Sequence, residues 1–432
     1  LDTEYRYLSD WVEGEISGSY LPSDDVYGDD RWAIDQTHEL RLGRSVRGEL
    51  RQQRTSDMAF NDDFGNDFDD RSAAFMESRA ELSWADRGFL ASIDTQSWQR
   101  VDDERSPPYA RRPRVQLGYD PVQGVGPFQF DIASEWTDFH NDDATQVQGI
   151  EYNIAPRLSL PVNELAYRFE PAVAFQHSGY DLTNPIGDDD SPSASVPIYT
   201  ADARLFFERR DTLFQGVHQT LEPRIRYRNV PDRGQDELPD FGSASTTGNF
   251  SRLFRTTAFN NDHTEQASVG VTTRYVDDRT GREYLRASFG QTFFFHDGAK
   301  RDRSDYITEL RLSLPRGFGI DADYRWDPDN TDTNKLRTLL RWRGDDQAAV
   351  NLSLRREDEE GVTERNQVTA SLAVPVTPGW RVFAGAREDL EERQTLESFL
   401  GVEQSGCCHS VRFVVTEERR RDVTAGQPAL DQ

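Results

Sequence analysis

The stretch Gln347-Ala348-Ala349-Val350-Asn351-Leu352-Ser353-Leu354 decides the fold, because apolar residues occupy every second position from Ala348 onward. Alternate side chains of a β-strand point to opposite faces, so this stretch would present one apolar and one polar face. The same period of two returns at 128–132, 165–169, 367–374 and 411–415. No long stretch has helical spacing. The chain is therefore predicted to be all-β.

The connections between these strands alternate in length along the whole chain. Short turns are predicted near 9–12, 43–47, 86–88, 120–127, 161–164, 210–216, 276–282, 315–317, 344–346, 375–379 and 404–406. Longer polar loops are predicted at 22–35, 56–71, 100–112, 138–146, 177–197, 229–265, 296–304, 327–334, 356–364 and 389–394. This alternation is typical of a large transmembrane antiparallel β-barrel, with the short turns in the periplasm. The segments between the turns indicate roughly 22 strands, within the known range. The connection 229–265 is long enough to hide another hairpin around Phe250–Phe254.

The composition fits such a barrel. The 432 residues carry a net charge of −27 and are only 35% hydrophobic. A barrel strand needs only every second residue to be apolar, so the low apolar content does not argue against a membrane protein. No run of about 18 apolar residues occurs, which excludes a membrane-spanning helix. The negative charge would be repelled by phosphates, so nucleic-acid binding is disfavoured.

The order of the connections also predicts where the chain ends lie. The first turn is short, so residues 1–8 would descend to the periplasm, and the last strand, near 408–418, would rise from it. Single-chain barrels usually have both termini in the periplasm and an even number of strands. We therefore expect residues 1–432 to be a barrel of roughly two dozen strands, truncated at both ends, with 419–432 as a loop or tail.

Charged residues of both signs occupy the polar positions of the predicted strands. A charge facing lipid costs roughly 2–4 kcal/mol at mid-depth, so these side chains are expected to face a wet interior. The set includes Arg168, Glu170, Arg204, Arg224, Arg226, Arg228, Arg286 and Arg355. A hydrated interior suits a plug protein, a saccharide-bearing substrate or a porin channel equally well.

Three of the predicted outer loops are rich in carboxylates. Their acidic residues are Asp57, Asp62, Asp63, Asp67, Asp69 and Asp70, then Asp188, Asp189 and Asp190, then Glu357, Asp358, Glu359 and Glu360. Oxygen-rich loops suit calcium or magnesium, which could bridge to phosphates. Solvated, self-repelling loops are the favoured interpretation, so no metal site is predicted.

Catalysis and cofactor binding have little support in the sequence. The seven histidines are scattered, at 38, 140, 177, 218, 263, 296 and 409. No HExxH, GxSxG or phosphate-loop motif occurs. A barrel hydrolase could still assemble a triad from distant strands, which keeps an outer-membrane enzyme as a rival hypothesis.

The only two cysteines, Cys407 and Cys408, are adjacent and fall beside a predicted short turn. Adjacent cysteines bridge each other only with a strained backbone, so each is expected to pair with a distant partner. The periplasm is oxidising, which favours disulfides at that rim. Two unpaired thiols are the alternative.

Four stretches resemble the LptD family of outer-membrane lipopolysaccharide (LPS) assembly proteins, also called the organic-solvent-tolerance family. They are Gln219–Arg224 with the motif Glu222-Pro223-Arg224, Phe250–Arg255 with Arg252-Leu253-Phe254, Val269–Tyr275 followed by Leu285–Gln291, and Leu400–Cys408. The opening Glu4–Leu8 also fits the start of the family's barrel, and the resemblance extends to about Glu418. The chain departs from the family pattern at 229–245 and 258–263.

The resemblance implies a very large barrel in the outer membrane of a Gram-negative bacterium. It implies that the barrel inserts LPS into the outer leaflet, without covalent chemistry, through a wet lumen and a lateral seam between the first and last strands. The implied partners are LPS, the plug lipoprotein LptE inside the lumen, and a periplasmic bridge reached through an N-terminal jelly-roll domain that these residues lack. The partners of Cys407 and Cys408 would lie in that N-terminal region.

Two questions stay open. A diffusion porin or plugged uptake transporter is the alternative function, although the cysteine pair argues against it.

Pro223 cannot donate a ladder hydrogen bond, so it is expected at a strand start, an edge or a bulge. The motif around it could shape the lumen wall or contact a plug, but a strand entry fixed by proline is the favoured interpretation.

Overall fold

The structure is a computed structural model that describes all residues except 26, 59, 61–63, 65–74, 102–107, 122–123, 144, 186–187, 211–214, 236–237, 242–248, 256–258, 260–261, 296–300, 331, 345–347, 360–361, 408 and 419–432. The strands are β1 (Asp2–Leu8), β2 (Val12–Leu21), β3 (Arg31–Leu42), β4 (Val46–Thr55), β5 (Phe75–Asp86), β6 (Phe89–Arg100), β7 (Ala110–Tyr119), β8 (Gln129–His140), β9 (Gln148–Ser159), β10 (Val162–Asn163), β11 (Tyr167–Thr183), β12 (Ser193–Leu205), β13 (Phe207–Arg210), β14 (Val217–Val230), β15 (Thr264–Asp277), β16 (Glu283–Phe294), β17 (Tyr306–Ser313), β18 (Phe318–Asp327), β19 (Asp332–Arg343), β20 (Ala349–Glu359), β21 (Val362–Thr377), β22 (Trp380–Asp389), β23 (Gln394–Ser405) and β24 (Ser410–Glu418). Two short 3₁₀ helices, η2 (Phe250–Phe254) and η3 (Pro315–Gly317), complete the described elements. No helix of the described residues is long and apolar enough to cross a membrane.

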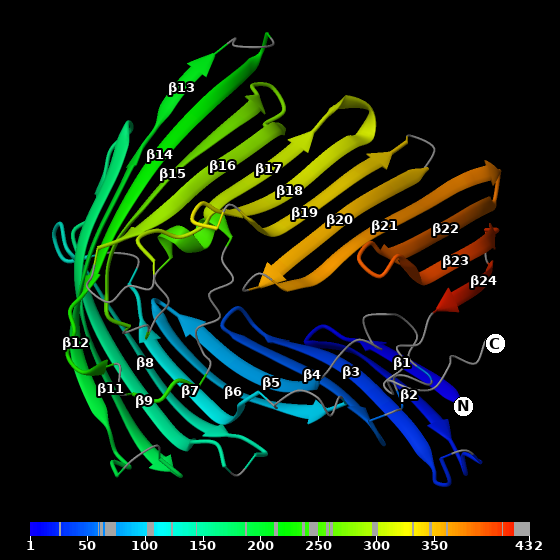
Figure 1. The fold of residues 1–432 in the computed structure, drawn as a ribbon, viewed down its shortest axis with the longest axis horizontal. Helices are drawn as coiled ribbons and strands as arrows, with labels where there is room; N and C mark the ends of the chain where they lie inside the picture. The colour runs from blue at the N-terminus through cyan, green and yellow to red at the C-terminus, as the bar shows by residue number, and fades with distance from the viewer. Residues whose placement is uncertain are drawn as a thin grey trace.

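All described strands belong to one antiparallel sheet in which each strand pairs with its neighbour in the chain. The short β10 continues β9 along β11, and β13 continues β12 along β14, which leaves 22 spanning strands in the described chain. The all-β fold and the strand estimate are thus confirmed. Figure 1 shows the sheet curving into an incomplete ring with β1 and β24 at its two ends.

The sheet is not closed within the described residues. The first strand, β1, pairs only with β2, and the last strand, β24, pairs only with β23. Within the described residues, each of these two strands therefore has a paired neighbour on one side only.

Strand β20, which contains the alternating residues Val350, Leu352 and Leu354, has the two distinct faces that its period of two predicts. In β20 and β21, Val350 pairs with Leu372 and Leu352 pairs with Ala370, so the apolar residues meet on one face. Asn351 pairs with Ser371 on the other face and donates to its hydroxyl at 3.3 Å. Val350 is still 41% exposed, because the apolar face points away from the inside of the ring.

Two belts of large aromatic side chains mark the edges of this apolar outer face. One belt lies at the short-turn ends of the strands and includes Trp84, Phe89, Tyr119, Phe318, Trp342 and Trp380. The other lies toward the long-loop ends and includes Tyr20, Trp32, Tyr199, Phe293, Tyr306 and Trp326. Transmembrane barrels carry aromatic girdles at both membrane interfaces, so the belts define a membrane band between them.

The long connection from β14 to β15 differs from the expectation. Residues 229–265 were predicted to be long enough to hide a further hairpin near Phe250. The described residues there form η2 instead. A strand would have needed a neighbour for its ladder, whereas η2 is closed locally by Asn249, whose side chain accepts from the backbone N–H of Arg252 at 3.2 Å.

Candidate functional site on the inner wall

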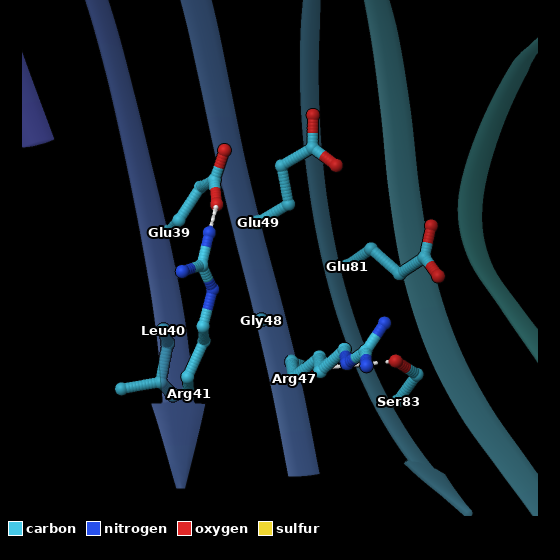
Figure 2. A pocket seen from close by; sticks show the side chains of 8 residues that line it. All are labelled: Glu39, Leu40, Arg41, Arg47, Gly48, Glu49, Glu81 and Ser83. Carbon is cyan, nitrogen blue, oxygen red and sulfur yellow. Dashed lines mark hydrogen bonds and ion pairs between the residues drawn. The ribbon is translucent and has the colours of Figure 1, made fainter. Parts of the chain in front are cut away.

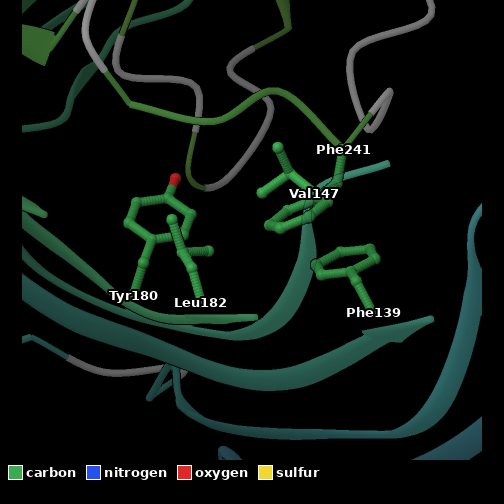
Figure 3. Packing of buried hydrophobic residues seen from close by; sticks show 5 residues of the cluster. All are labelled: Phe139, Val147, Tyr180, Leu182 and Phe241. Carbon is green, nitrogen blue, oxygen red and sulfur yellow. The ribbon is translucent and has the colours of Figure 1, made fainter. Parts of the chain in front are cut away.

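The connection between β14 and β15 folds back over the inner wall at two places. At the first, Phe241 stacks on Phe139 of β8 with ring centroids 4.4 Å apart, and meets Tyr109 edge-on at 5.0 Å. Figure 3 shows Phe241 above Val147 and the side chains of β8 and β11. Burial raises the pKa of Tyr109. The cluster ties the connection to the long-loop ends of these strands.

At the second place η2 lies on two glycines. Gly270 of β15 and Gly290 of β16 are register partners. A Cβ on Gly270 would lie 2.7 Å from the Phe250 ring, and a Cβ on Gly290 would lie 2.8 Å from Leu253 Cδ1. Only glycine leaves the wall flat enough for η2 to sit this close. We call η2 and the wall beneath it the inner platform.

Ion pairs anchor the same platform. Arg224 of β14 donates to both carboxylate oxygens of Asp202, at 2.9 Å and 2.8 Å, and its guanidinium lies 4.6 Å from the centroid of the Phe254 ring. Arg226 donates to the carbonyl oxygen of Phe254 at 2.6 Å. The platform therefore joins the Glu222-Pro223-Arg224 motif to the Arg252-Leu253-Phe254 motif. At its other end, the Phe250 N–H donates to the carboxylate of Glu309 at 2.8 Å.

The carboxylate of Glu222 is buried beside two arginines. It accepts a hydrogen bond from Arg204, and Arg274 Nε lies 3.6 Å from its Oε1. Its residue is 8% exposed. The bonds run across three neighbouring strands, so this carboxylate holds the wall together beside the platform.

Pro223 is not at a strand entry, so the favoured interpretation of that residue is wrong. It lies inside β14, in register with Val271 on one side. On the other side the neighbouring strand is interrupted at Phe206, between β12 and β13, and the register gives neither Glu222 nor Pro223 a partner there. An interruption tolerates a residue without an N–H, as the expected edge or bulge would.

The charged strand residues lie on the inner wall, as expected, and are paired. Arg157 bridges Asp131 at 2.9 Å and also pairs with Glu170, which accepts from Arg168 at 2.8 Å. Further along the wall Arg286 donates to Glu283 at 2.8 Å, and Arg355 donates to Glu357 at 2.8 Å. The wall is therefore a lattice of opposite charges facing water. No group of described acidic, histidine or cysteine side chains could hold a metal ion.

A row of carboxylates lines the inner wall near the first short turns. Glu39, Glu49 and Glu81 are register partners across β3, β4 and β5, around a shallow hollow of about 640 Å³ (Figure 2). The same row continues to Glu13 on β2 and Asp94 on β6. Arginines pair with four of the five: Arg41 with Glu13 and Glu39, Arg79 with Glu81, and Arg114 with Asp94. Like charges directly opposite each other destabilise a sheet.

We expect the Glu49→Gln variant to be slightly more stable than the parent protein, by about 0.5 kcal/mol, because it removes the central charge of this row. The temperature at which the folded barrel unfolds on a denaturing gel checks this. The Glu15→Gln variant is the control, because Glu15 pairs with Arg6 at 3.1 Å and its loss should not stabilise the protein. A Glu49→Gln barrel that unfolds at a lower temperature would contradict the prediction.

The acidic outer loops are only partly as expected. Asp57 was grouped with solvated carboxylates, but it is buried and receives two hydrogen bonds from Arg31, at 3.0 Å and 2.8 Å. The guanidinium of Arg31 also lies 4.8 Å from the Tyr27 ring, so it joins two outer loops. Asp188, Asp189 and Asp190 are exposed, whereas Glu357 and Asp358 pair with neighbouring arginines. Residues 62, 63, 67, 69, 70 and 360 lie outside the described residues, and the side chain of Glu359 is not described.

The cysteine pair remains a prediction. Cys407 is exposed in the turn between β23 and β24, at the short-turn end of the sheet. Cys408 lies outside the described residues. The position agrees with the expected rim, and nothing tests the expected partners.

Sequence reasoning missed several residues of the platform. Gly270 and Gly290 lie within longer stretches that resemble the family, and the sequence alone gave them no role. Glycine inside a predicted strand signals close approach of another segment, so both could have been singled out. The partners Asp202 and Glu309 carried no such signal, because an acidic residue on the polar face of a strand is ordinary.

This large sheet has an apolar outer face bounded by two aromatic belts and a charged inner face. Such a sheet is the wall of an integral outer-membrane β-barrel. Residues 29–380 match the family model described as LptD, LPS transport system D. The chain belongs to the LptD family, which confirms the resemblance found in the sequence.

Curated relatives match nearly the whole chain. It is 32% identical over 435 residues to the LPS-assembly protein LptD of Alkalilimnicola ehrlichii, a match that covers 95% of this chain and 57% of the relative. The LPS-assembly protein LptD of Xanthomonas oryzae pv. oryzae is 27% identical over 488 residues, covering 97% of this chain and 60% of the relative. The chain thus spans less than two thirds of the length of these relatives.

Proposed function

We propose that this chain forms the membrane wall of a protein that inserts lipopolysaccharide into the outer leaflet of the outer membrane. The observation that carries the proposal is a sheet with a charged inside and an apolar outside bounded by two belts of aromatic side chains. An amphipathic lipid needs such a wall, because its saccharide can stay in the wet interior while its acyl chains reach the membrane. The printed name of the relatives, LPS-assembly protein, supports the same substrate.

The transport step requires no covalent chemistry. The paired charges of the inner wall offer a hydrated surface for the saccharide, and the apolar outer face borders the lipid. Energy would come from outside the chain, through the periplasmic bridge. An enzymatic barrel has no observation in its favour among the described residues.

The partners of the whole protein belong to the same proposal. The matching relatives are much longer, so an N-terminal periplasmic domain would receive LPS from the bridge. The plug lipoprotein LptE would occupy the lumen beside the inner platform. Cys407 and Cys408 would form disulfides with that N-terminal region, and thiol titration of the full-length protein that finds both reduced would contradict this pairing.

Depletion of the protein in its source cell tests the function. We expect newly made LPS to disappear from the cell surface as the protein is depleted, measured by surface labelling of LPS. Re-expression of the full-length protein should restore it. Normal labelling in depleted cells would end the proposal.

A solute channel is the second candidate, because a charged, hydrated lumen also suits diffusion. Conductance in planar bilayers separates the two. The full-length protein with its plug should conduct little, since the plug would fill the lumen beside η2. Strong ohmic conductance of that complex would favour the porin.

A further inference from the structure

A chain of hydrogen bonds runs across the outer face of the first strands. The Tyr7 hydroxyl of β1 lies 2.7 Å from Nδ1 of His38 on β3, and His38 Nε2 lies 3.1 Å from Oε1 of Gln36. Gln36 then donates from its Nε2 to Oε1 of Gln52 on β4 at 2.5 Å. One direction satisfies every link: Tyr7 donates to His38, which donates to Gln36, which donates to Gln52. We call these four side chains the outer clip.

The outer clip faces the membrane. On β3, Gln36 and His38 share their face with Trp32, Leu40 and Leu42, whereas Glu39 and Arg41 point to the inner wall. Both residues lie within a strand of Arg31–Leu42, between the two aromatic belts. Polar side chains in hydrocarbon are costly unless they are hydrogen-bonded, so a polar set placed there needs its internal bonds.

A glycine makes the clip possible. Gly14 of β2 is the register partner of both Tyr7 and His38. A Cβ on Gly14 would lie 2.3 Å from His38 Nδ1 and 2.7 Å from the Tyr7 hydroxyl oxygen. The Tyr7–His38 bond therefore passes directly over β2, and it joins β1 to β3 without using β2 as an intermediate.

Among the described residues, the strand pair β23–β24 has no comparable tie on its outer face. Among the described residues of β24, the side-chain hydrogen bonds come from Ser410 and Arg412, close to the short turn. Arg412 donates to Glu403 of β23 on the inner wall at 2.8 Å. Above it, Phe413 and Val415 lie on the outer face, in register with the apolar Val402 and Leu400 of β23. Lipid tails can replace such contacts at little cost.

We propose that the outer clip makes β1 to β4 one rigid unit in the membrane, so that lateral opening is accommodated by the C-terminal strands. Tyr7 and His38 are positioning residues: they touch no substrate and act by holding β1. The reason is that the outer face is surrounded by hydrocarbon, which cannot replace a broken hydrogen bond. Breaking the clip inside the membrane exposes donors and acceptors to hydrocarbon, whereas moving β24 exchanges apolar contacts for lipid. The role in opening rests on the proposed function, but the rigidity does not.

Hydrogen exchange of the full-length protein in lipid nanodiscs tests the rigidity. The Tyr7→Phe variant removes only the hydroxyl, and it should speed exchange of the β1 amides about fivefold, the effect of losing one hydrogen bond. Tyr5→Phe is the matched control, because Tyr5 lies on the same face of β1, stacks on Tyr7 at 6.0 Å and is outside the clip. Gly14→Ala keeps every donor but inserts a Cβ into the bridge, so it should resemble Tyr7→Phe. Equal exchange in Tyr7→Phe, Tyr5→Phe and the parent protein would overturn the clip.

Engineered disulfides test the direction of opening. Tyr5 and Ile16 are register partners on β1 and β2, and Leu400 and Val415 are register partners on β23 and β24. A cysteine pair at the first position should leave surface LPS unchanged, because those strands already move together. A pair at the second should reduce surface LPS, and a reductant should restore it.

The two experiments can fail separately. Loss of surface LPS from the β1–β2 pair, or none from the β23–β24 pair, would overturn the inferred direction of opening. Normal surface LPS after depletion of the protein would instead remove the proposed function. The exchange result depends on neither, since it measures the clip alone.

Discussion

Replacing Gly270 with valine should expel η2 from the inner wall and widen the lumen. Valine is a good strand residue, so the sheet itself should form. Its Cβ, however, would lie 2.7 Å from the Phe250 ring and 2.9 Å from the Phe254 ring. Phe254 is only 3% exposed, and bringing such a side chain back into water costs roughly 2–3 kcal/mol. We expect a several-fold rise in single-channel conductance in planar bilayers.

The matched control is valine at Gly319, another glycine on the inner wall. There the nearest atom to a new Cβ would be 3.6 Å away, which is an ordinary contact. The Gly319→Val protein should therefore conduct like the parent. A Gly270→Val protein that folds fully and conducts no more than the control would show that η2 does not limit the lumen.

The second large effect is expected at Glu222. The Glu222→Gln variant keeps the shape of the side chain but leaves Arg204 and Arg274 without their shared charge. Breaking a buried ion pair costs about 3–5 kcal/mol. The side chains of the two arginines are 30% and 33% exposed, so water compensates part of the loss. We expect the free energy of unfolding to fall by about 2 kcal/mol.

Urea unfolding of the barrel in detergent measures this loss. The comparison is Glu403→Gln, which removes a carboxylate paired with Arg412 at the end of the sheet, where the Arg412 side chain is 61% exposed. That pair should contribute less than about 1 kcal/mol. Equal unfolding midpoints for the two variants would contradict the assignment of Glu222 as the buried anchor of the wall.

Most of the fold was accessible from the sequence because the signals are local. Alternation within a few residues, as from Ala348 to Leu354, decides that a segment is a strand and which side chains share a face. The lengths of the connections decide on which side of the membrane each turn lies. These rules predicted the strands, the polar inner wall carrying Arg224 and Arg226, and the barrel class. They failed at η2, because a 3₁₀ turn inside a long connection has no periodicity to detect.

The candidate site was accessible only in part. The resemblance singled out Glu222-Pro223-Arg224 and Arg252-Leu253-Phe254, but it could not show that they meet. That contact depends on a backbone passing over Gly270 and Gly290, which belong to neither motif. The proline shows the same limit: its missing N–H predicts an irregularity nearby, but the interruption at Phe206 lies on the neighbouring strand.

The sequence by itself therefore determined the class of this protein, the sides of its strands and the positions of its turns. Each of those follows from residues that are neighbours in the chain. Only the tertiary structure decided that η2 lies on the inner wall, that Asp57 is buried against Arg31, and that Tyr7 reaches His38 over Gly14. The physical reason is register: an offset of one residue between two strands would turn each of these side chains to the opposite face.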